Sequence, residues 1–187
     1  MRANEDIEAT PSDVELVAAM NRGDAAAFEV LYFRHRDWVA GLAYRFTGDS
    51  DAARDVMQET FLYFLKKFPG FRLTANFKTF LYPAVRNLSI AARRKNARYQ
   101  GTADAAEELE QAAAPEAVAA EGGDLQFVLA ALPEEQREVL LLRFVDGLSL
   151  AEIGEAMDIP LGTVKSRLHN ALQTLREDQR TRNFFAQ

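Results

Sequence analysis

The feature that constrains the fold most is a break in hydrophobic periodicity at residues 99–124. This segment, YQGTADAAEELEQAAAPEAVAAEGGD, has Leu109 and Val118 as its only large aliphatic residues and ends in Gly-Gly. Ala and Glu tolerate transient helix, but no apolar face is available to dock such a helix on a core. Apolar residues recur at helical spacing on both sides. The sequence therefore predicts an all-α protein in which a flexible acidic linker joins two small helical domains.

The half before the break has the pattern of helices behind a flexible tail at residues 1–11. Ser12 and Glu15 have the spacing of a capping box, which predicts a first helix from near Asp13 to about residue 23. Asp24 can cap a second helix over residues 25–46. The second helix has one apolar stripe at three- and four-residue steps, made of Phe28, Leu31, Tyr32, His35, Val39, Leu42 and Phe46.

Two more helices complete a four-helix N-terminal domain at residues 12–98. Asp49 or Ser50 caps the third, which Pro69-Gly70 closes. The fourth contains Pro83, whose ring would clash with the carbonyl four residues back. This helix therefore either starts near Thr79, with the proline in its opening turns, or is kinked. The predicted apolar faces are Val56, Phe61, Leu65 and Phe68 in the third helix and Leu81, Val85, Leu88 and Ala92 in the fourth.

Residues 125–187 have the pattern of a helix-turn-helix domain. Pro133 suits the first turn of a helix that Gly147 ends. Ser149 caps a short helix at Leu150–Met157, and a turn at residues 158–161 leads to a longer helix that starts at Gly162-Thr163. The residues expected to pack these helices are Val139, Leu140, Leu142 and Phe144, followed by Val164, Leu168, Ala171 and Leu175.

Charge is distributed unevenly along the chain. The formal net charge of −6 alone suggests a protein that polyanions repel. However, residues 72–98 contain seven basic residues and no acid, and lie beside aromatic residues. Residues 165–176 also lack an acid, whereas residues 134–158 carry seven acids and two bases. A solvated helix face would explain one such run, but two acid-free basic segments favour nucleic-acid binding.

The last helix carries the chemistry for reading DNA. With Val164 and Leu168 facing inward, its outward residues can bind base edges or phosphates. Its first free N–H groups can bind a phosphate. Any amphipathic helical pair could show this spacing, but the purely basic charge argues against a generic pair. The outward residues are Lys165, Ser166, His169 and Asn170, with Arg167 beside them.

Composition excludes several classes of function. Without any cysteine there is no disulfide framework, thiolate metal site or cysteine nucleophile. The two histidines, His35 and His169, lie on separate domains, so no catalytic or metal-binding constellation is expected, and no cofactor. There is no apolar region at the N-terminus and no stretch near the ~20 apolar residues of a membrane span. We expect a cytoplasmic protein without membrane insertion that is not an enzyme.

Two sequence segments match a known family in the expected order. LAALPEEQREVLLLRFVDGLSLAEIGEAMDIPLGTVKSRLHNAL resembles the promoter −35-reading domain of bacterial RNA polymerase sigma factors. DAARDVMQETF, followed by FKTFLYPAVRNLSI, is similar to the −10-reading and core-binding domain of the extracytoplasmic-function (ECF) group. The resemblance implies a factor that binds core polymerase, recognises both promoter elements and melts DNA. Family members also often have an anti-sigma factor as antagonist.

The resemblance also implies roles for individual residues. Asp55, Gln58, Glu59 and Phe61 match the helix that binds the polymerase clamp, although Phe61 is equally explained by core packing. Asn87 matches a position that hydrogen-bonds a base flipped from the single-stranded −10 element. The other −10 candidates are Arg72, Phe77, Lys78, Phe80, Tyr82, Arg86, Arg93 and Arg94, whose aromatics could wall the pocket or simply pack.

In the duplex −35 element, the resemblance implies contacts from the last helix. Lys165, Ser166 and His169 match base contacts, with Thr163 and Arg167 on the backbone. The chain departs from the family where Phe80 replaces a usual Trp, Ala91 an acidic residue and Asn170 a basic one, and at Pro83. These departures leave the family assignment intact but weaken any transfer of a promoter sequence from the family. The alternative function is a conventional helix-turn-helix regulator that binds its operator without core polymerase.

Overall fold

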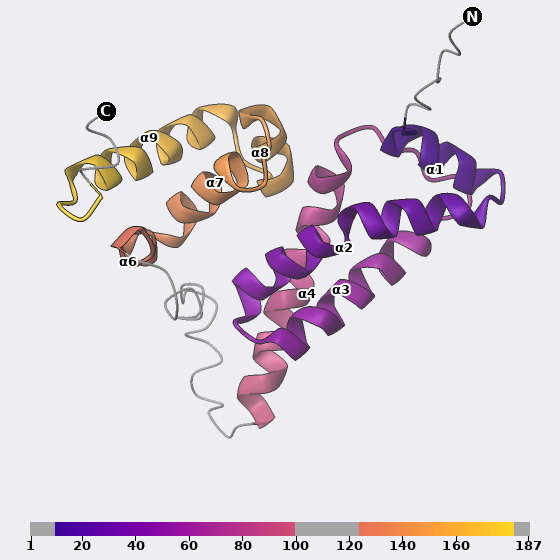
Figure 1. Cartoon of the computed structure of the whole chain (residues 1–187), viewed down its shortest axis with the longest axis horizontal. Coiled ribbons are helices and arrows are strands. Elements are labelled where there is room, and N and C mark those ends of the chain that lie inside the picture. Colours follow the sequence, from indigo (N-terminus) through magenta and orange to yellow (C-terminus); the bar gives the residue numbers. More distant parts are fainter. Residues whose placement is uncertain (1–9, 100–123, 182–187) are drawn as a thin grey trace, which may run out of the picture.

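The computed structural model describes residues 10–99 and 124–181, except for the side chains of residues 99 and 124–126. All regular structure in these ranges is helical, which confirms the all-α prediction (Figure 1). Residues 100–123 of the predicted linker at 99–124, and most of the predicted tail at 1–11, lie outside the described residues. The helices are α1 (Asp13–Asn21), α2 (Ala25–Thr47), α3 (Ser50–Leu65), α4 (Phe77–Tyr99), α6 (Asp124–Ala131), α7 (Glu134–Phe144), α8 (Leu150–Met157) and α9 (Leu161–Glu177).

Side-chain caps fix the starts of the first three helices. Ser12 and Glu15 form the expected capping box at α1, with the Ser12 N–H donating to the Glu15 carboxylate at 2.8 Å. Asp24 accepts from the first N–H groups of α2. Asp49, and not Ser50, caps α3 by accepting from the Ala52 N–H at 2.7 Å. Local side-chain chemistry therefore determines where α1, α2 and α3 begin.

The end and the buried face of α3 differ from the prediction. The helix ends at Leu65, several residues before Pro69-Gly70. Leu65 is 37% exposed, whereas Phe64 is completely buried and its ring lies 5.0 Å from the ring of Phe77. The buried stripe runs through Val56, Thr60 and Phe64 at four-residue steps, which turns Leu65 to the next face. Leu65 is therefore a surface residue, and Phe64 is the centre of an aromatic cluster.

Helix α4 is one continuous helix that contains Pro83. It begins at Phe77, two residues earlier than Thr79, so the proline lies in its second turn. Proline has no N–H, so the Thr79 carbonyl receives no helical hydrogen bond from that position. The residues after the proline carry the basic run towards the end of α4.

In the C-terminal domain, two predicted details of α7 are wrong. Pro133 occupies the N-cap position just before the helix, not its first turn. Phe144 is 62% exposed because the helix ends there and the chain turns at Gly147, which has φ of 75°. The predicted packing residues Val139, Leu140 and Leu142 are buried. Helix α6 has no counterpart among the predicted elements.

The helix-turn-helix motif forms as predicted. Ser149 and Glu152 make a capping box at α8, and Asp158 ends the helix in the left-handed region at φ of 55°. The Ile159 N–H donates to the Gly154 carbonyl at 2.9 Å, which closes the turn. Helix α9 starts at Leu161, slightly before the predicted Gly162-Thr163.

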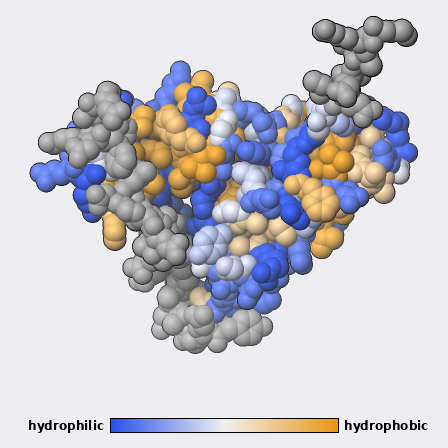
Figure 2. Space-filling view, viewed as in Figure 1, coloured by the Kyte–Doolittle hydropathy of each residue, from blue (hydrophilic) through white to orange (hydrophobic). Residues whose placement is uncertain are grey.

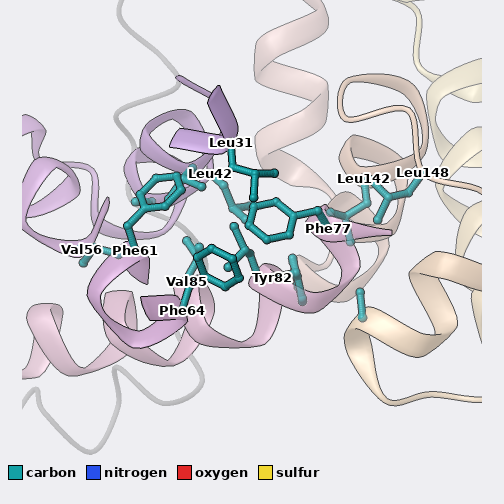
Figure 3. Packing of buried hydrophobic residues seen from close by; sticks show 14 of the residues in the cluster. Leu31, Leu42, Val56, Phe61, Phe64, Phe77, Tyr82, Val85, Leu142 and Leu148 are labelled. Carbon is teal, nitrogen blue, oxygen red and sulfur yellow. The ribbon is translucent and has the colours of Figure 1, made fainter. Parts of the chain in front are cut away.

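The two domains pack directly against each other. One hydrophobic cluster runs from α1–α4 into residues of α7, α8 and α9, and α4 is the helix that contacts α8. Figure 3 shows Leu142 and Leu148 of the C-terminal domain at one end of the row of N-terminal core residues. The C-terminal domain also has its own small core of Val128, Leu132, Leu140, Ala171 and Leu175. Of the candidate site residues, Tyr82, Arg86, Asn87 and Arg167 line the seam between the domains.

Candidate nucleic-acid and polymerase interface

Helix α9 presents the polar face that the sequence predicts. Lys165, Ser166, His169 and Asn170 are all exposed, because Val164 and Ala171 take the buried side of the helix. The Ser166 hydroxyl donates to the Thr163 carbonyl at 3.0 Å. This surface offers an ammonium, an imidazole and an amide to a groove edge without rearrangement of the helix.

Arg167 does not join this exposed face. Its guanidinium lies 2.5 Å from the carboxylate of Glu135 on α7, and its side chain is only 20% exposed. The pair ties α9 to α7 within the C-terminal domain. A phosphate contact by Arg167 therefore competes with Glu135.

The far end of α4 forms an open basic surface. Ala91, Arg94, Lys95 and Arg98 line a hollow there, and Arg93 is half-buried nearby. Figure 2 shows hydrophilic surface at the end of the N-terminal domain where α3 begins and α4 ends. Of the other −10 candidates, Arg72 is exposed on the loop before α4. Positive side chains at this density suit a phosphate backbone.

The aromatic residues of the −10 prediction are mostly core residues. Phe77 is 1% exposed and packs its ring 4.7 Å from that of His35. Phe80 is half-buried and lies 4.7 Å from the ring of Phe71. Packing is therefore the observed role of Phe77, whose ring has no free face for a base. Phe80 keeps part of its surface in contact with solvent.

Tyr82, Arg86 and Asn87 lie together at the seam between the domains. They border a groove of about 380 Å³ that the C-terminal domain closes on its other side with Glu138 and Arg167. Asn87 is exposed in this groove. Tyr82 is 1% exposed, and its hydroxyl donates to the Glu138 carboxylate. Asn87, which is predicted to bind a flipped base, is thus accessible to solvent, but the C-terminal domain forms the other side of its groove.

Burial at this seam raises the pKa of Glu138 to about 7, although Arg167 and Arg45 oppose the shift. The Arg86 guanidinium also faces Glu138, at 3.7 Å. A carboxyl near its midpoint at neutral pH can exist in either protonation state, so the seam contains a titratable contact.

A second interdomain contact involves residues that no local sequence signal marks. The Asp146 carboxylate is 3% exposed and accepts from the Trp38 indole N–H at 2.9 Å. It also accepts from both terminal nitrogens of Arg45, at 2.5 and 3.3 Å. Lys78, a predicted −10 residue, donates to the Asp146 main-chain carbonyl at 2.8 Å and lies over the Trp38 ring. For the contact with Lys78, the sequence offers only the contrast between the basic residues 72–98 and the acid-rich residues 134–158.

The candidate polymerase-binding residues divide into two groups. Asp55, Gln58 and Glu59 are exposed on α3. Phe61 is 3% exposed and makes an edge contact with Tyr32 at a ring separation of 4.9 Å, so its observed role is core packing. The exposed side of α3 is therefore acidic and accessible to a protein partner.

The described residues contain neither a membrane-spanning helix nor a cluster of metal-binding side chains. No helix there is long and apolar enough to cross a membrane. Within the same ranges, no group of three or more His, Asp or Glu residues is arranged to hold a metal ion.

Comparisons with known proteins give the family. The model of sigma-70 region 2 matches residues 31–99, and the model of sigma-70 region 4 matches residues 128–177. The chain is 32% identical over 178 residues to the ECF RNA polymerase sigma factor SigW of Bacillus subtilis, covering 88% of this chain and 95% of that protein. This chain belongs to the ECF family of RNA polymerase sigma factors.

Further relatives of this ECF sigma factor agree. It is 31% identical over 176 residues to the RNA polymerase sigma-H factor of Pseudomonas aeruginosa, covering 87% of this chain and 91% of that protein. The ECF sigma-E factor of Escherichia coli is 33% identical over 177 residues, with 88% and 92% covered. These matches cover both domains, so they support sigma function over the alternative of an independent regulator.

Solved structures show the same fold. CnrH, solved in complex with the cytosolic domain of CnrY, has a TM-score of 0.63 at 23% identity, covering 87% of this chain and 93% of that one. RpoE of Bartonella quintana, solved with the anti-sigma factor NepR, has a TM-score of 0.61 at 24% identity, covering 80% and 94%. At these identities the likeness concerns the fold alone.

Proposed function

We propose that this ECF sigma factor divides promoter recognition between α9 and α4. The exposed residues Lys165, Ser166, His169 and Asn170 read the duplex −35 element. The observation that carries this assignment is their joint exposure on the second helix of a helix-turn-helix whose first helix begins at a capping box. Thr163 and, once released from Glu135, Arg167 contact the backbone.

Helix α4 takes the single-stranded −10 element. Asn87 offers an amide that can hydrogen-bond the edge of an unpaired base, and Arg86 lies one residue before it for a phosphate. Arg93 and Arg94 continue the basic surface along the same helix. Melting is then driven by trapping of an unpaired base, with no chemical reaction in this chain.

The exposed face of α3 binds the polymerase core. Asp55, Gln58 and Glu59 present two carboxylates and an amide to solvent, which suit a basic partner surface. Binding to core holds the two reading domains on one promoter, so avidity replaces the affinity of either domain alone. The place of action is the cytoplasm, where RNA polymerase transcribes DNA.

An anti-sigma factor is the proposed antagonist. Support comes from the structural neighbour solved with NepR, which is described as an anti-sigma factor. A partner that covers both α3 and the seam would block polymerase and the −10 strand together.

Transcription in vitro tests the proposal. Purified core polymerase and this chain are supplied with genomic templates, and transcripts and promoter binding are measured with and without core. We expect specific transcripts and tight promoter binding only when both are present. Equal promoter binding without core, or no transcripts with both proteins, would contradict the proposal. Glu177→Gln removes one charge from the exposed end of α9 and serves as a control, which should keep the transcription activity of the parent chain.

A further inference from the structure

Two carboxylates of the C-terminal domain occupy one face of the N-terminal domain. Asp146 follows α7, and Glu138 lies on α7 itself. Their partners Trp38 and Arg45 lie on α2, and Tyr82 on α4. Each carboxylate is thus satisfied by groups from the other domain.

The Asp146 contact has the geometry of a specific clamp. A guanidinium that binds both oxygens of one carboxylate fixes distance and orientation together. The indole N–H of Trp38 adds a third donor, and Lys78 holds the adjoining main-chain carbonyl. Because the side chain of Asp146 is 3% exposed, loss of these donors would leave an unpaired charge within the seam.

The Glu138 contact covers residues proposed to bind DNA. Tyr82 is 1% exposed, with its hydroxyl bonded to Glu138, and Arg86 lies 3.7 Å from the same carboxylate. Lys78 is held by Asp146 in the same way. Carboxylate and carbonyl oxygens therefore occupy places that phosphate oxygens and base edges would take. DNA and the C-terminal domain compete for the same donors.

We propose that Asp146 and Glu138 form an intramolecular latch that keeps the free chain closed and withholds Lys78, Tyr82 and Arg86 from single-stranded DNA. The inference rests on the proposed −10 function of α4. It requires no antagonist protein, because the inhibitory groups belong to the chain itself. Opening exposes the groove and lets the two domains reach separate promoter elements.

Energy transfer between two dyes measures opening directly. The chain contains no cysteine, so Glu29→Cys on α2 and Gln179→Cys after α9 label two exposed sites uniquely. In the absence of DNA and polymerase, we expect high transfer in the parent chain and reduced transfer in Asp146→Asn. Glu177→Gln removes an equal charge from an exposed position and keeps the transfer high. Equal transfer in the parent and Asp146→Asn would overturn the latch.

Binding of DNA measures the consequence of opening. A labelled pool of random single-stranded oligonucleotides is titrated with the same full-length variants, without core. If about one tenth of the parent molecules are open, Asp146→Asn gains up to about tenfold in affinity. Glu177→Gln should not differ from the parent. Opening without any gain in affinity would overturn the autoinhibitory role.

A second variant removes a partner of Asp146 in the N-terminal domain. Trp38→Phe keeps an aromatic ring, smaller than the indole, but removes the N–H that donates to Asp146, and its fold is checked by circular dichroism. It should open the chain in the same direction by a smaller amount, and no opening in either folded variant would contradict the latch. Dye transfer is read without polymerase, whereas the proposed sigma function is read by transcription, so the two can fail separately.

Discussion

Glu138 connects protonation to the stability of the seam. Tyr82 and Arg86 of α4, Arg45 of α2 and Arg167 of α9 all face this carboxyl, yet burial still raises its pKa to about 7. The folded chain therefore holds a proton that an unfolded carboxyl with a pKa of 4.5 releases. Folding stability should fall as pH rises from about 4.5 to about 7, by at most about 3 kcal/mol.

The pH dependence can be measured with a neutral variant. In Glu138→Gln, urea unfolding should show a weaker loss of stability between about pH 5 and about pH 8, because the titrating carboxyl is gone. The same variant should be more stable than the parent at the higher pH. A pH profile that is unchanged by the substitution would show that Glu138 is not the group responsible.

Asn87 should separate DNA melting from polymerase binding. In Asn87→Ala, loss of the amide that bonds the unpaired base should reduce promoter opening by about tenfold or more. Reactivity of unpaired thymines at the −10 element measures opening, and co-purification with core measures polymerase binding, which should not change.

Asn96→Ala is the matched control for this substitution. Asn96 is an exposed asparagine on the same helix, beyond the groove that contains Asn87. Equal defects in both variants would argue for a general effect on α4 instead of a base contact.

Among the elements, the turn of the helix-turn-helix depends on Gly154. A Cβ at this position would lie 3.0 Å from the Ile159 carbonyl oxygen, a main-chain atom that cannot move independently. Gly154→Ala should therefore destabilise the C-terminal domain by about 1–3 kcal/mol, despite the better helix propensity of alanine.

Gly162→Ala provides the comparison within the same motif. Its Cβ would meet no atom within 4 Å, so a gain of up to about 1 kcal/mol from helix propensity is expected. Thermal unfolding of the two variants tests the contrast. A stabilised Gly154→Ala variant would mean that the turn has room to relax.

Elements with local signals could be predicted from sequence. The capping boxes at Ser12 and Ser149 mark where α1 and α8 begin, and the stripe of α2 marks its buried side. The exposed face of α9 follows in the same way from its periodicity. At Phe64 and Leu65, a shift of one residue in the helical pattern decides which side chain is buried. The prediction from the apolar pattern was wrong there because both residues are large and apolar.

The part that local pattern could not give is the docking of one domain on the other. The Tyr82 hydroxyl bonds to Glu138 of the other domain, and Asp146 pairs with Trp38 and Arg45, which are about a hundred residues away in sequence. Such contacts depend on tertiary placement, for which residue spacing carries no signal. In the sequence, the acid-rich stretch that contains Glu138 and Asp146 served only as a contrast to the basic helix that follows it. In the fold, this stretch also binds the N-terminal domain.

At the scale of the whole molecule, the single tryptophan reports on the seam. Trp38 is half-buried and donates to Asp146, so its emission should change when the domains separate. We expect the emission of Trp38 to change at lower urea concentration than the far-ultraviolet helix signal, because the seam between the domains opens before the rest of each domain unfolds.

Asp146→Asn provides the reference state for this measurement. Its tryptophan emission without urea should already be shifted towards that of the opened parent chain, while its helix signal stays native. Coincident transitions of both signals in the parent would show instead that separation and unfolding occur as one cooperative event.

The bond from Lys78 to the carbonyl of residue 146 has a consequence for how such a contact can evolve. A main-chain oxygen is present whichever amino acid occupies that position, so replacing the aspartate weakens the hold without abolishing it. Natural variation at one site can thus adjust the resting balance in small steps, whereas complete independence of the two halves requires further changes, at the lysine, at Glu138 and in the shared hydrophobic cluster.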